Sequence, residues 1–297
     1  MPGHAPEDAV VDKDGNLIVG VDDGRVLRID PITEVATVLA VTGGRPLGLE
    51  VMADGHILIC DSPRGLLKLN PHNGHLSIVL DSFEGRPLRF CSNVTTSADG
   101  TIYFSTSTDR YTERDWRKDM FENIPTGRLF RLSPDGQLDL LCDGLYFANG
   151  LALAHDESWI MVAESGACRL RRVWLKGPKA GTNKIFAELP GFPDNCSMSA
   201  DGLIWVAIAT PKNAALEKLH RMPLLVRMLI ARLPKAVQPR PEAVAWVMAL
   251  DAMGNVIYDY CWTDGQFAMV TGVCQHERTV YLGSLVESAI LSFELPL

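Results

Sequence analysis

The stretch GFPDNCSMSADGLIWVA, residues 191–207, contains two apolar segments separated by a tight turn at Asp201-Gly202. Short apolar segments on either side of an Asp-Gly turn predict a β-hairpin, because this turn suits the twist of paired strands. Segments with the same organisation recur along the chain. They cover residues 7–30, 47–70, 92–107, 149–165, 194–209 and 271–285.

The spacing of these hairpins defines a repeating unit. The second turn residues are Gly15, Gly55, Gly100, Glu157, Gly202 and Arg278, at intervals of 40, 45, 57, 45 and 76 residues. The two long intervals contain insertions, roughly 109–126 and 211–243, and several units continue into a third apolar strand. Units of about 40–45 residues with three or four strands are typical of propeller blades. We therefore predict an all-β chain, a single six-bladed β-propeller over residues 1–297; a β-sandwich is disfavoured because six copies share one register.

The insertion at 211–243 breaks the β pattern inside the predicted fifth blade. Its stretch PLLVRMLIARLPKA, residues 223–236, has apolar residues at helical spacing with Arg and Lys between them. This pattern predicts one or two short amphipathic helices. We favour a lid that packs on the propeller face. Helices that contact a membrane surface or a protein partner are the alternative, because nearly all the charges there are positive.

Composition narrows the function classes. The formal net charge of −8 argues against general nucleic-acid binding, which needs a clustered basic surface. Seven scattered cysteines without a CxxC pair indicate reduced thiols, and we expect a reducing, cytoplasmic location. No apolar run is long enough to span a membrane, and the first residues, MPGHAPED, lack signal-peptide character. Strand-like sequence follows Met1 almost directly, which leaves open that an upstream segment was removed.

The repeat also predicts which residues meet at the propeller axis, where the innermost strand of each blade begins. The residues eight and seven positions before each turn residue are Glu7-Asp8, Leu47-Gly48, Ser92-Asn93, Asn149-Gly150, Asp194-Asn195 and Val270-Thr271. Five of these side chains are carboxylate or amide oxygen donors: Glu7, Asn93, Asn149, Asp194 and Asn195. Oxygen donors without thiols or histidines suit Ca²⁺ first, with Mg²⁺ or Mn²⁺ as substitutes. The alternative is that these residues only cap the starts of strands.

Several segments carry a family resemblance: GRPLGLEVMADGHILICD (44–61), FANGLALAHDESWIMVAES (147–165) and RRVWLKGPKAGTNKIFAELPGFPDN (171–195). They resemble the strictosidine-synthase-like proteins, and within that group the adipocyte plasma membrane-associated proteins; the wider superfamily includes the SMP-30/gluconolactonases and the paraoxonases. The resemblance covers almost the whole chain. It implies a six-bladed propeller with a calcium-type ion at the channel mouth. The lactonase ligands would correspond to Glu7, Asn149 and Asp194, and the additional paraoxonase ligands to Asn93 and Asn195.

The sequence also departs from these relatives. The resemblance places Thr271 where the plant synthases have the Glu that catalyses condensation of an amine with an aldehyde. Leu47 stands where paraoxonases have a histidine. Val94 replaces the Asp that would hold a second calcium ion, so we predict only one ion. Synthase-type condensation is therefore the less favoured activity.

We expect a metal-dependent hydrolase of an apolar lactone or an aryl or activated ester. Asp194 is the expected general base, and the five oxygen donors named above would hold the ion. Residues expected to line an apolar substrate pocket are Tyr111, Trp116, Met222 and Leu225. The chain lacks GxSxG, P-loop and GxGxxG motifs, so the corresponding nucleophile and nucleotide chemistries have no support. The alternative from another class is a metal-stabilised propeller that binds a partner without catalysis.

Overall fold

The computed structural model describes residues 1–296 of the 297-residue chain and forms a six-bladed β-propeller, as predicted. In the described residues, five blades are four-stranded antiparallel sheets, the sixth has three strands, and β9 and β10 form a separate two-stranded ribbon. Within each blade the strands follow one another in chain order, so sequential hairpins build every sheet. This local pairing is what the regular Asp-Gly turns favour.

The strands fall into blades as follows. Blades 1 to 3 contain β1 (Ala9–Val11), β2 (Leu17–Gly20), β3 (Arg25–Ile29), β4 (Ala36–Val41); β5 (Arg45–Val51), β6 (Ile57–Ser62), β7 (Gly65–Leu69), β8 (Leu76–Leu80); and β11 (Cys91–Thr96), β12 (Ile102–Thr106), β13 (Gly127–Leu132), β14 (Leu138–Leu145). Blades 4 to 6 contain β15 (Ala148–Leu153), β16 (Trp159–Glu164), β17 (Arg169–Trp174), β18 (Asn183–Glu188); β19 (Gly191–Met198), β20 (Ile204–Pro211), β21 (Ala245–Leu250), β22 (Val256–Trp262); and β23 (Val270–His276), β24 (Thr279–Ser284), β25 (Leu291–Glu294). The ribbon pairs β9 (Ser82–Phe83) with β10 (Arg86–Pro87).

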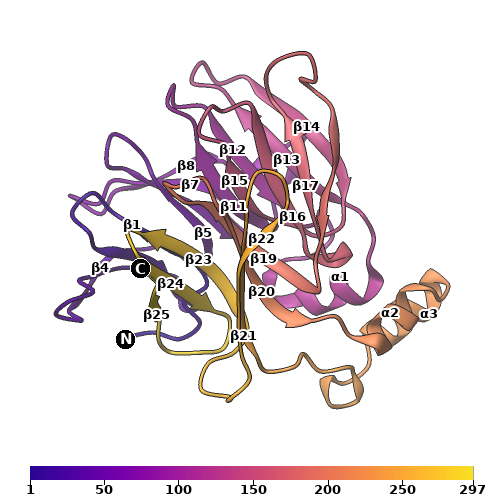
Figure 1. Cartoon of the computed structure of the whole chain (residues 1–297). Helices are drawn as coiled ribbons and strands as arrows, with labels where there is room; N and C mark the ends of the chain where they lie inside the picture. The colour runs from indigo at the N-terminus through magenta and orange to yellow at the C-terminus, as the bar shows by residue number, and fades with distance from the viewer. Residues whose placement is uncertain (297) are drawn as a thin grey trace.

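The first and last blades lie side by side and close the ring, which brings the N-terminus near β25 (Figure 1). Backbone hydrogen bonds join them, from Ser284 N to Pro6 O at 2.7 Å and from Ala5 N to Glu287 O at 2.7 Å. The apolar core lies between the faces of neighbouring blades; Met161 and Ala163 of blade 4, for example, pack with Cys196 and other apolar residues of blade 5. Each blade is therefore stabilised mainly by its two neighbours.

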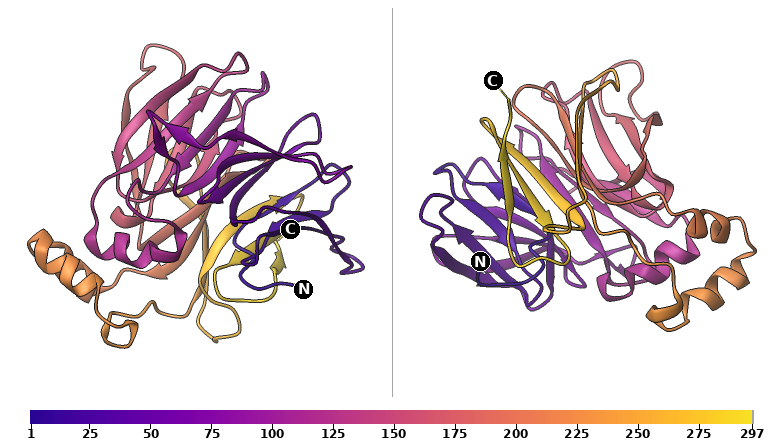
Figure 2. Two further views of the ribbon diagram at one scale, coloured as in Figure 1. Left: turned by 180° about the vertical axis from the view of Figure 1, so that it is seen from behind. Right: turned by 60° about the horizontal axis from the view of Figure 1, so that its bottom comes forward.

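Both insertions form helices on one end of the propeller, and we call them together the cap (residues 109–126 and 211–243). Its elements are η1 (Glu113–Asp115), α1 (Trp116–Glu122), α2 (Ala214–His220), α3 (Leu224–Ala231) and η3 (Lys235–Val237); the short helix η2 (Ser165–Ala167) lies outside it, between β16 and β17. Two further views show α1, α2 and α3 gathered at the same end (Figure 2). The helical insertion between β20 and β21 confirms the prediction for blade 5.

The start of each inner strand is bulged in blades 2 to 6. The pairing of the inner strand with the next strand shifts between Pro46 and Leu49, Cys91 and Val94, Ala148 and Leu151, Pro193 and Cys196, and Val270 and Val273. A bulge leaves residues unpaired and turns their side chains in a new direction. The two residues inside each bulge are the pair that the repeat places at the axis. In blade 6 the pair inside the bulge is Thr271-Gly272. Counting back from the turn predicts Val270-Thr271, so the prediction is wrong by one residue in this blade.

Candidate active site at the mouth of the central channel

The first residue of each axial pair faces the cap end of the channel. We call these six residues the channel ring: Glu7, Leu47, Ser92, Asn149, Asp194 and Thr271. Except for Leu47, all of them line one pocket of about 940 Å³, including its open mouth, beneath the cap. Glu7, Ser92, Asn149 and Thr271 are buried, whereas Asp194 is half-buried and faces the pocket. The structure thus brings Glu7, Asn149 and Asp194 together on one surface.

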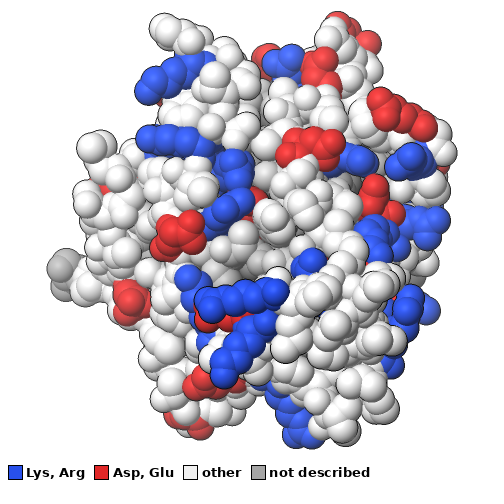
Figure 3. All heavy atoms as spheres, turned by 90° about the vertical axis from the view of Figure 1, so that its right-hand side faces the viewer, with Lys and Arg blue, Asp and Glu red and all other residues white. Residues whose placement is uncertain are grey.

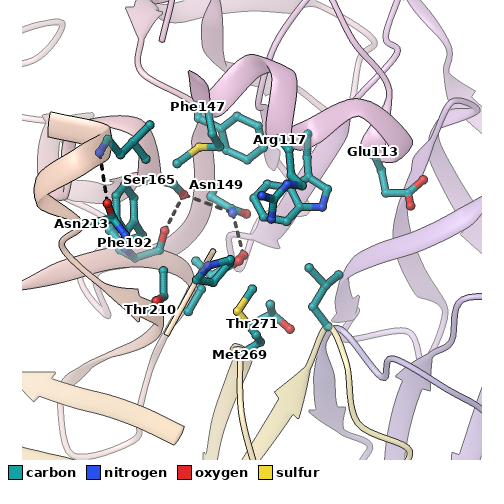
Figure 4. Close-up of a pocket in the computed structure, with 18 of the residues that line it drawn as sticks. Glu113, Arg117, Phe147, Asn149, Ser165, Phe192, Thr210, Asn213, Met269 and Thr271 are labelled. Atoms are coloured by element: carbon teal, nitrogen blue, oxygen red, sulfur yellow. Dashed lines mark hydrogen bonds between the residues drawn. The ribbon is translucent and has the colours of Figure 1, made fainter. Parts of the chain in front are cut away.

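Hydrogen bonds link the ring residues from blade to blade. Asn149 Nδ2 donates to Asp194 Oδ1 at 2.6 Å, and Ser92 Oγ donates to Asn149 Oδ1 at 2.8 Å. Thr271 Oγ1 donates to the backbone oxygen of Glu7 at 2.8 Å. Figure 4 shows Asn149 in the middle of the pocket, with its bonds to neighbouring polar groups. These bonds fix the orientation of the Asp194 carboxylate.

The second residue of each pair lies deeper in the channel. Asn93 Nδ2 donates to Asn195 Oδ1 at 3.0 Å, and Asn93 Oδ1 accepts the Leu151 backbone N–H at 3.0 Å. Asn93 also lines a separate cavity at the opposite end of the channel. The Asn195 Nδ2 atom is buried and has no hydrogen-bond partner within the described part of the chain. The structure therefore places Asn93 and Asn195 beneath the pocket floor, in contact with each other.

The two acidic ring residues have strongly perturbed acidities. Burial raises the pKa of Glu7 to about 7, although the nearby Arg45 guanidinium, 3.2 Å away, acts in the opposite direction. Burial and the charge of Glu7 raise the pKa of Asp194 well above its usual range. Among the Lys, Arg and His side chains that the structure describes, none forms an ion pair with Asp194. Two carboxyl groups that raise each other's energy when charged, of which only Glu7 has an arginine partner among the described side chains, make a site in which an added cation is favoured.

The donor set fits a hard cation. No cluster of three or more His, Cys, Asp or Glu arranged for a metal occurs in the described part of the chain, so any site here depends on amide and hydroxyl oxygens as well. Glu7 and Asp194 supply carboxylates, and Asn149 supplies an amide oxygen, the ligand types that Ca²⁺ prefers. Asp194, a carboxyl whose pKa is raised by burial and by the charge of Glu7, is the feature that a cation nearby would compensate.

An apolar layer lies directly above the channel ring. Phe90, Phe147, Phe192 and Met269 each precede a ring residue by two positions, and all four line the pocket. All four stand at the same offset from the ring in their blades, and this repeated offset is the sequence signal that could have identified them. Figure 4 shows Phe147, Phe192 and Met269 around Asn149. The backbone is left-handed at Phe147 (φ 55°) and Met269 (φ 53°), a strained conformation often found at functional sites.

The cap closes the pocket from above. Trp116, Met120 and Phe121 of the first insertion and Leu216 of α2 contribute apolar surface, so Trp116 is the one of the four expected substrate-binding residues that lines the pocket. Tyr111, Met222 and Leu225 are not among the residues that line the pocket. The Tyr111 hydroxyl donates to Glu122 Oε1 at 2.8 Å, and the Leu225 side chain is 74% exposed. The 211–243 insertion nevertheless lies on the ring side, because Asn213, Pro239 and Arg240 also line the pocket.

Comparison with known proteins identifies similar sequences and folds. Residues 93–178 match the family described as strictosidine synthase, and residues 1–29 match the strictosidine synthase-like N-terminal family. Protein STRICTOSIDINE SYNTHASE-LIKE 10 of Arabidopsis thaliana is 34% identical over 255 residues, which cover 78% of this chain and 68% of that protein. The adipocyte plasma membrane-associated protein of Rattus norvegicus is 31% identical over 308 residues, covering 95% of this chain and 81% of that protein.

Solved structures share the fold at lower identity. A gluconolactonase from Xanthomonas campestris superposes with a TM-score of 0.72 at 17% identity, covering 99% of this chain and 87% of that one. The calcium-binding protein regucalcin from Agrobacterium tumefaciens gives a TM-score of 0.66 at 16% identity, with coverage of 97% and 84%. At these identities the likeness concerns the propeller fold.

Proposed function

Since the chain belongs to the strictosidine synthase-like family, we propose that it is a calcium-dependent hydrolase of an apolar lactone or aryl ester. The observation that carries this proposal is the position of Asp194. Its half-buried carboxyl lies at the floor of an apolar pocket, beside Glu7, with a hydrogen bond from Asn149 and no basic partner among the described side chains. A carboxylate held in this way can take a proton from water next to a bound substrate.

Glu7, Asn149 and Asp194 would hold the ion, with Asn93 and Asn195 directly beneath. A calcium ion there would supply positive charge that stabilises the oxyanion developing on the substrate carbonyl. Mg²⁺ or Mn²⁺ could substitute, because they prefer the same oxygen ligands.

The chain's own residues supply the remaining chemistry. Asp194 accepts a proton as the water oxygen attacks the carbonyl carbon, and returns it to the alcohol oxygen when the ester bond breaks. Asn149 Nδ2 holds the Asp194 carboxylate in place at 2.6 Å during this transfer. Phe90, Phe147, Phe192 and Met269 surround the reacting group and exclude bulk water. These walls favour an aromatic or aliphatic substrate over a free sugar acid.

The channel ring also argues against condensation chemistry of the synthase type. Thr271 has a hydroxyl that donates to the Glu7 backbone, and it has no carboxylate with which to deprotonate an amine. Leu47 is fully buried and apolar, so that blade offers no base either. Asp194 and Glu7 are therefore the acidic groups of the ring available for proton transfer.

The test is a hydrolysis screen of the purified chain against aryl acetates and aliphatic lactones, with chelator and after calcium is restored. We expect turnover that chelator abolishes and calcium restores, together with about one tightly held Ca²⁺ per chain by elemental analysis. Hydrolysis that persists in chelator would contradict the proposed dependence on calcium. Calcium binding without turnover of any substrate would instead favour a metal-stabilised binding scaffold.

A further inference from the structure

The outer face of α3 is more apolar than its inner face. Leu225 and Leu229, one helical turn apart, are 74% and 65% exposed, and Val237 beyond the helix is 66% exposed. Met222, Leu224, Val226 and Leu233, in or next to α3, are also exposed large apolar residues. We call these seven residues the cap face. Monomeric proteins seldom leave so many neighbouring large apolar side chains in water unless the surface binds something.

The orientation of α3 is fixed by contacts on its other side. Arg227 Nη1 donates to the backbone oxygen of Glu122 at 2.5 Å, Ile230 packs against the apolar cluster under the cap, and Ala231 is buried. The apolar residues of the cap face therefore cannot turn inward without breaking these contacts. Their exposure is a consequence of the way α3 packs on α1.

The charge around the cap face has one sign. Residues 211–243 contain seven Lys and Arg but two acidic residues, Glu217 and Glu242, a local charge of +5 in a chain of −8. Lys218, Arg221, Arg232 and Arg240 are exposed. Figure 3, which views the molecule from the side of α2 and α3, shows an uncharged area bordered by Lys and Arg side chains. Apolar side chains surrounded by basic ones are typical of helices that lie in a membrane interface.

We propose that the cap face docks the protein on a lipid surface that carries anionic headgroups. The leucines would enter the interface, while the surrounding arginines contact the headgroups, and the pocket beneath the cap would open next to the lipid. A symmetric dimer through this face is disfavoured, because it would bring two basic segments together. No helix in residues 1–296 is long and apolar enough to cross a membrane. This proposal does not depend on the hydrolase activity.

The test measures sedimentation of the purified chain with vesicles of phosphatidylcholine alone or mixed with phosphatidylserine. We expect wild type to partition onto the phosphatidylserine vesicles and to dissociate as salt is raised. The double variant Leu225→Asp/Leu229→Asp should lower this partitioning at least about tenfold, since it puts charge where apolar contact is needed. Arg221→Gln/Arg232→Gln should lower binding to phosphatidylserine vesicles and weaken the salt dependence.

The matched control is Val38→Asp/Ile78→Asp, which changes two residues that are each 53% exposed on β4 and β8, outer strands of the first two blades. This control should bind vesicles like wild type. Thermal unfolding establishes that each variant is folded, and Leu225→Ser/Leu229→Ser replaces the Asp pair if that variant does not fold. Wild type that ignores anionic vesicles, or binding that the cap-face variants retain, would overturn the proposal. So would sedimentation velocity that shows a dimer which the same variants dissociate.

Discussion

The channel ring and the cap meet at one pocket, but they are held in place by different kinds of contact. Gly48, Gly150 and Gly272 follow ring residues, and the backbone of a neighbouring blade leaves no room for a side chain at these positions. The cap instead depends on side-chain contacts, such as those of Arg227 with the end of α1 and of Arg117 with Pro239 O at 3.0 Å. The chemistry therefore sits on rigid repeated backbone, whereas the surface that selects a ligand can vary with little effect on the propeller.

The largest effect is expected from Gly150→Ala, which tests the rigidity of the ring. A Cβ there would lie 2.5 Å from Asn195 Cα and closer still to the Cys196 backbone nitrogen, so blades 4 and 5 must separate. We expect a loss of at least about 5 kcal/mol in unfolding free energy, or failure to fold. Gly136→Ala is the control, since it has a left-handed φ of 89° but open space around it, and should cost about 1–2 kcal/mol. Urea titrations measure both variants. Equal losses of unfolding free energy in Gly150→Ala and Gly136→Ala would contradict the claim that contact with the neighbouring backbone makes Gly150 necessary.

A smaller, pH-dependent effect is expected in the cap at Asp119, which is 2% exposed on α1. Burial raises its pKa to about 7; a Thr108 hydrogen bond and Arg110 oppose the shift, while Glu122 and Asp109 add to it. Two other ionisable groups packed against α1, the helix that carries Asp119, are Arg227 of α3 and His220 of α2, which contact its C-terminal end.

Because the folded pKa lies above the unfolded value of about 3.9, the folded state binds more protons between these values. The contribution of Asp119 to stability is complete below about pH 4 and is lost as pH rises to 7. Asp119→Asn should therefore match wild type at pH 4 and exceed its unfolding free energy by up to about 4 kcal/mol at pH 8. Urea unfolding at pH 4 and pH 8 measures this. The prediction is contradicted if the difference in unfolding free energy between Asp119→Asn and wild type is the same at the two pH values.

The smallest effect is expected from Arg227→Ala, which removes the contact between α3 and α1. The cost in unfolding free energy should be about 1 kcal/mol, because the propeller does not depend on it. A looser cap should raise KM for the substrate found in the screen and leave kcat nearly unchanged. Arg232→Ala, at an exposed position on the same segment, is the matched control. A fall in kcat with no change in KM would show that the cap has another role.

The repeat in the sequence was sufficient for the fold and for most of the ring. The hairpin turns gave the correct axial pairs in five blades, because their loops have nearly equal lengths. Blade 6 differs, since His276 pairs directly with Thr279 and the shorter turn shifts the count by one residue. The strand bulges that orient Asn149 and Asp194 follow from packing between blades, and the sequence pattern does not indicate them.

The pocket walls were harder to predict than its floor. Helical spacing groups Leu225 with Leu229, but it does not say which face of a helix packs inward. In α3 the face with Ile230 and Ala231 is the inner one, so Leu225 lies outside the pocket. The repeat does not identify Phe90, Phe147 and Phe192 as pocket walls, although each lies two residues before a ring position, because side-chain direction there depends on the strand bulges and on local backbone conformation such as the left-handed Phe147.

The measurement that separates catalysis from calcium binding is the turnover of Asp194→Asn at saturating calcium. Asn keeps an oxygen donor of nearly the same shape but removes the charge and the basicity. Asn149→Ala is the comparison variant: it should weaken calcium binding, and excess calcium should restore part of its rate, the remaining loss coming from the missing hydrogen bond to Asp194. Calorimetric titration with calcium shows that both variants are loaded when the rates are measured.

We predict that loaded Asp194→Asn loses roughly 10²–10⁴-fold in kcat on the ester or lactone that wild type hydrolyses. Its calcium affinity should fall only modestly, because Glu7 and Asn149 remain. A loaded Asp194→Asn enzyme that keeps the full wild-type rate would contradict the assignment of Asp194 as the general base.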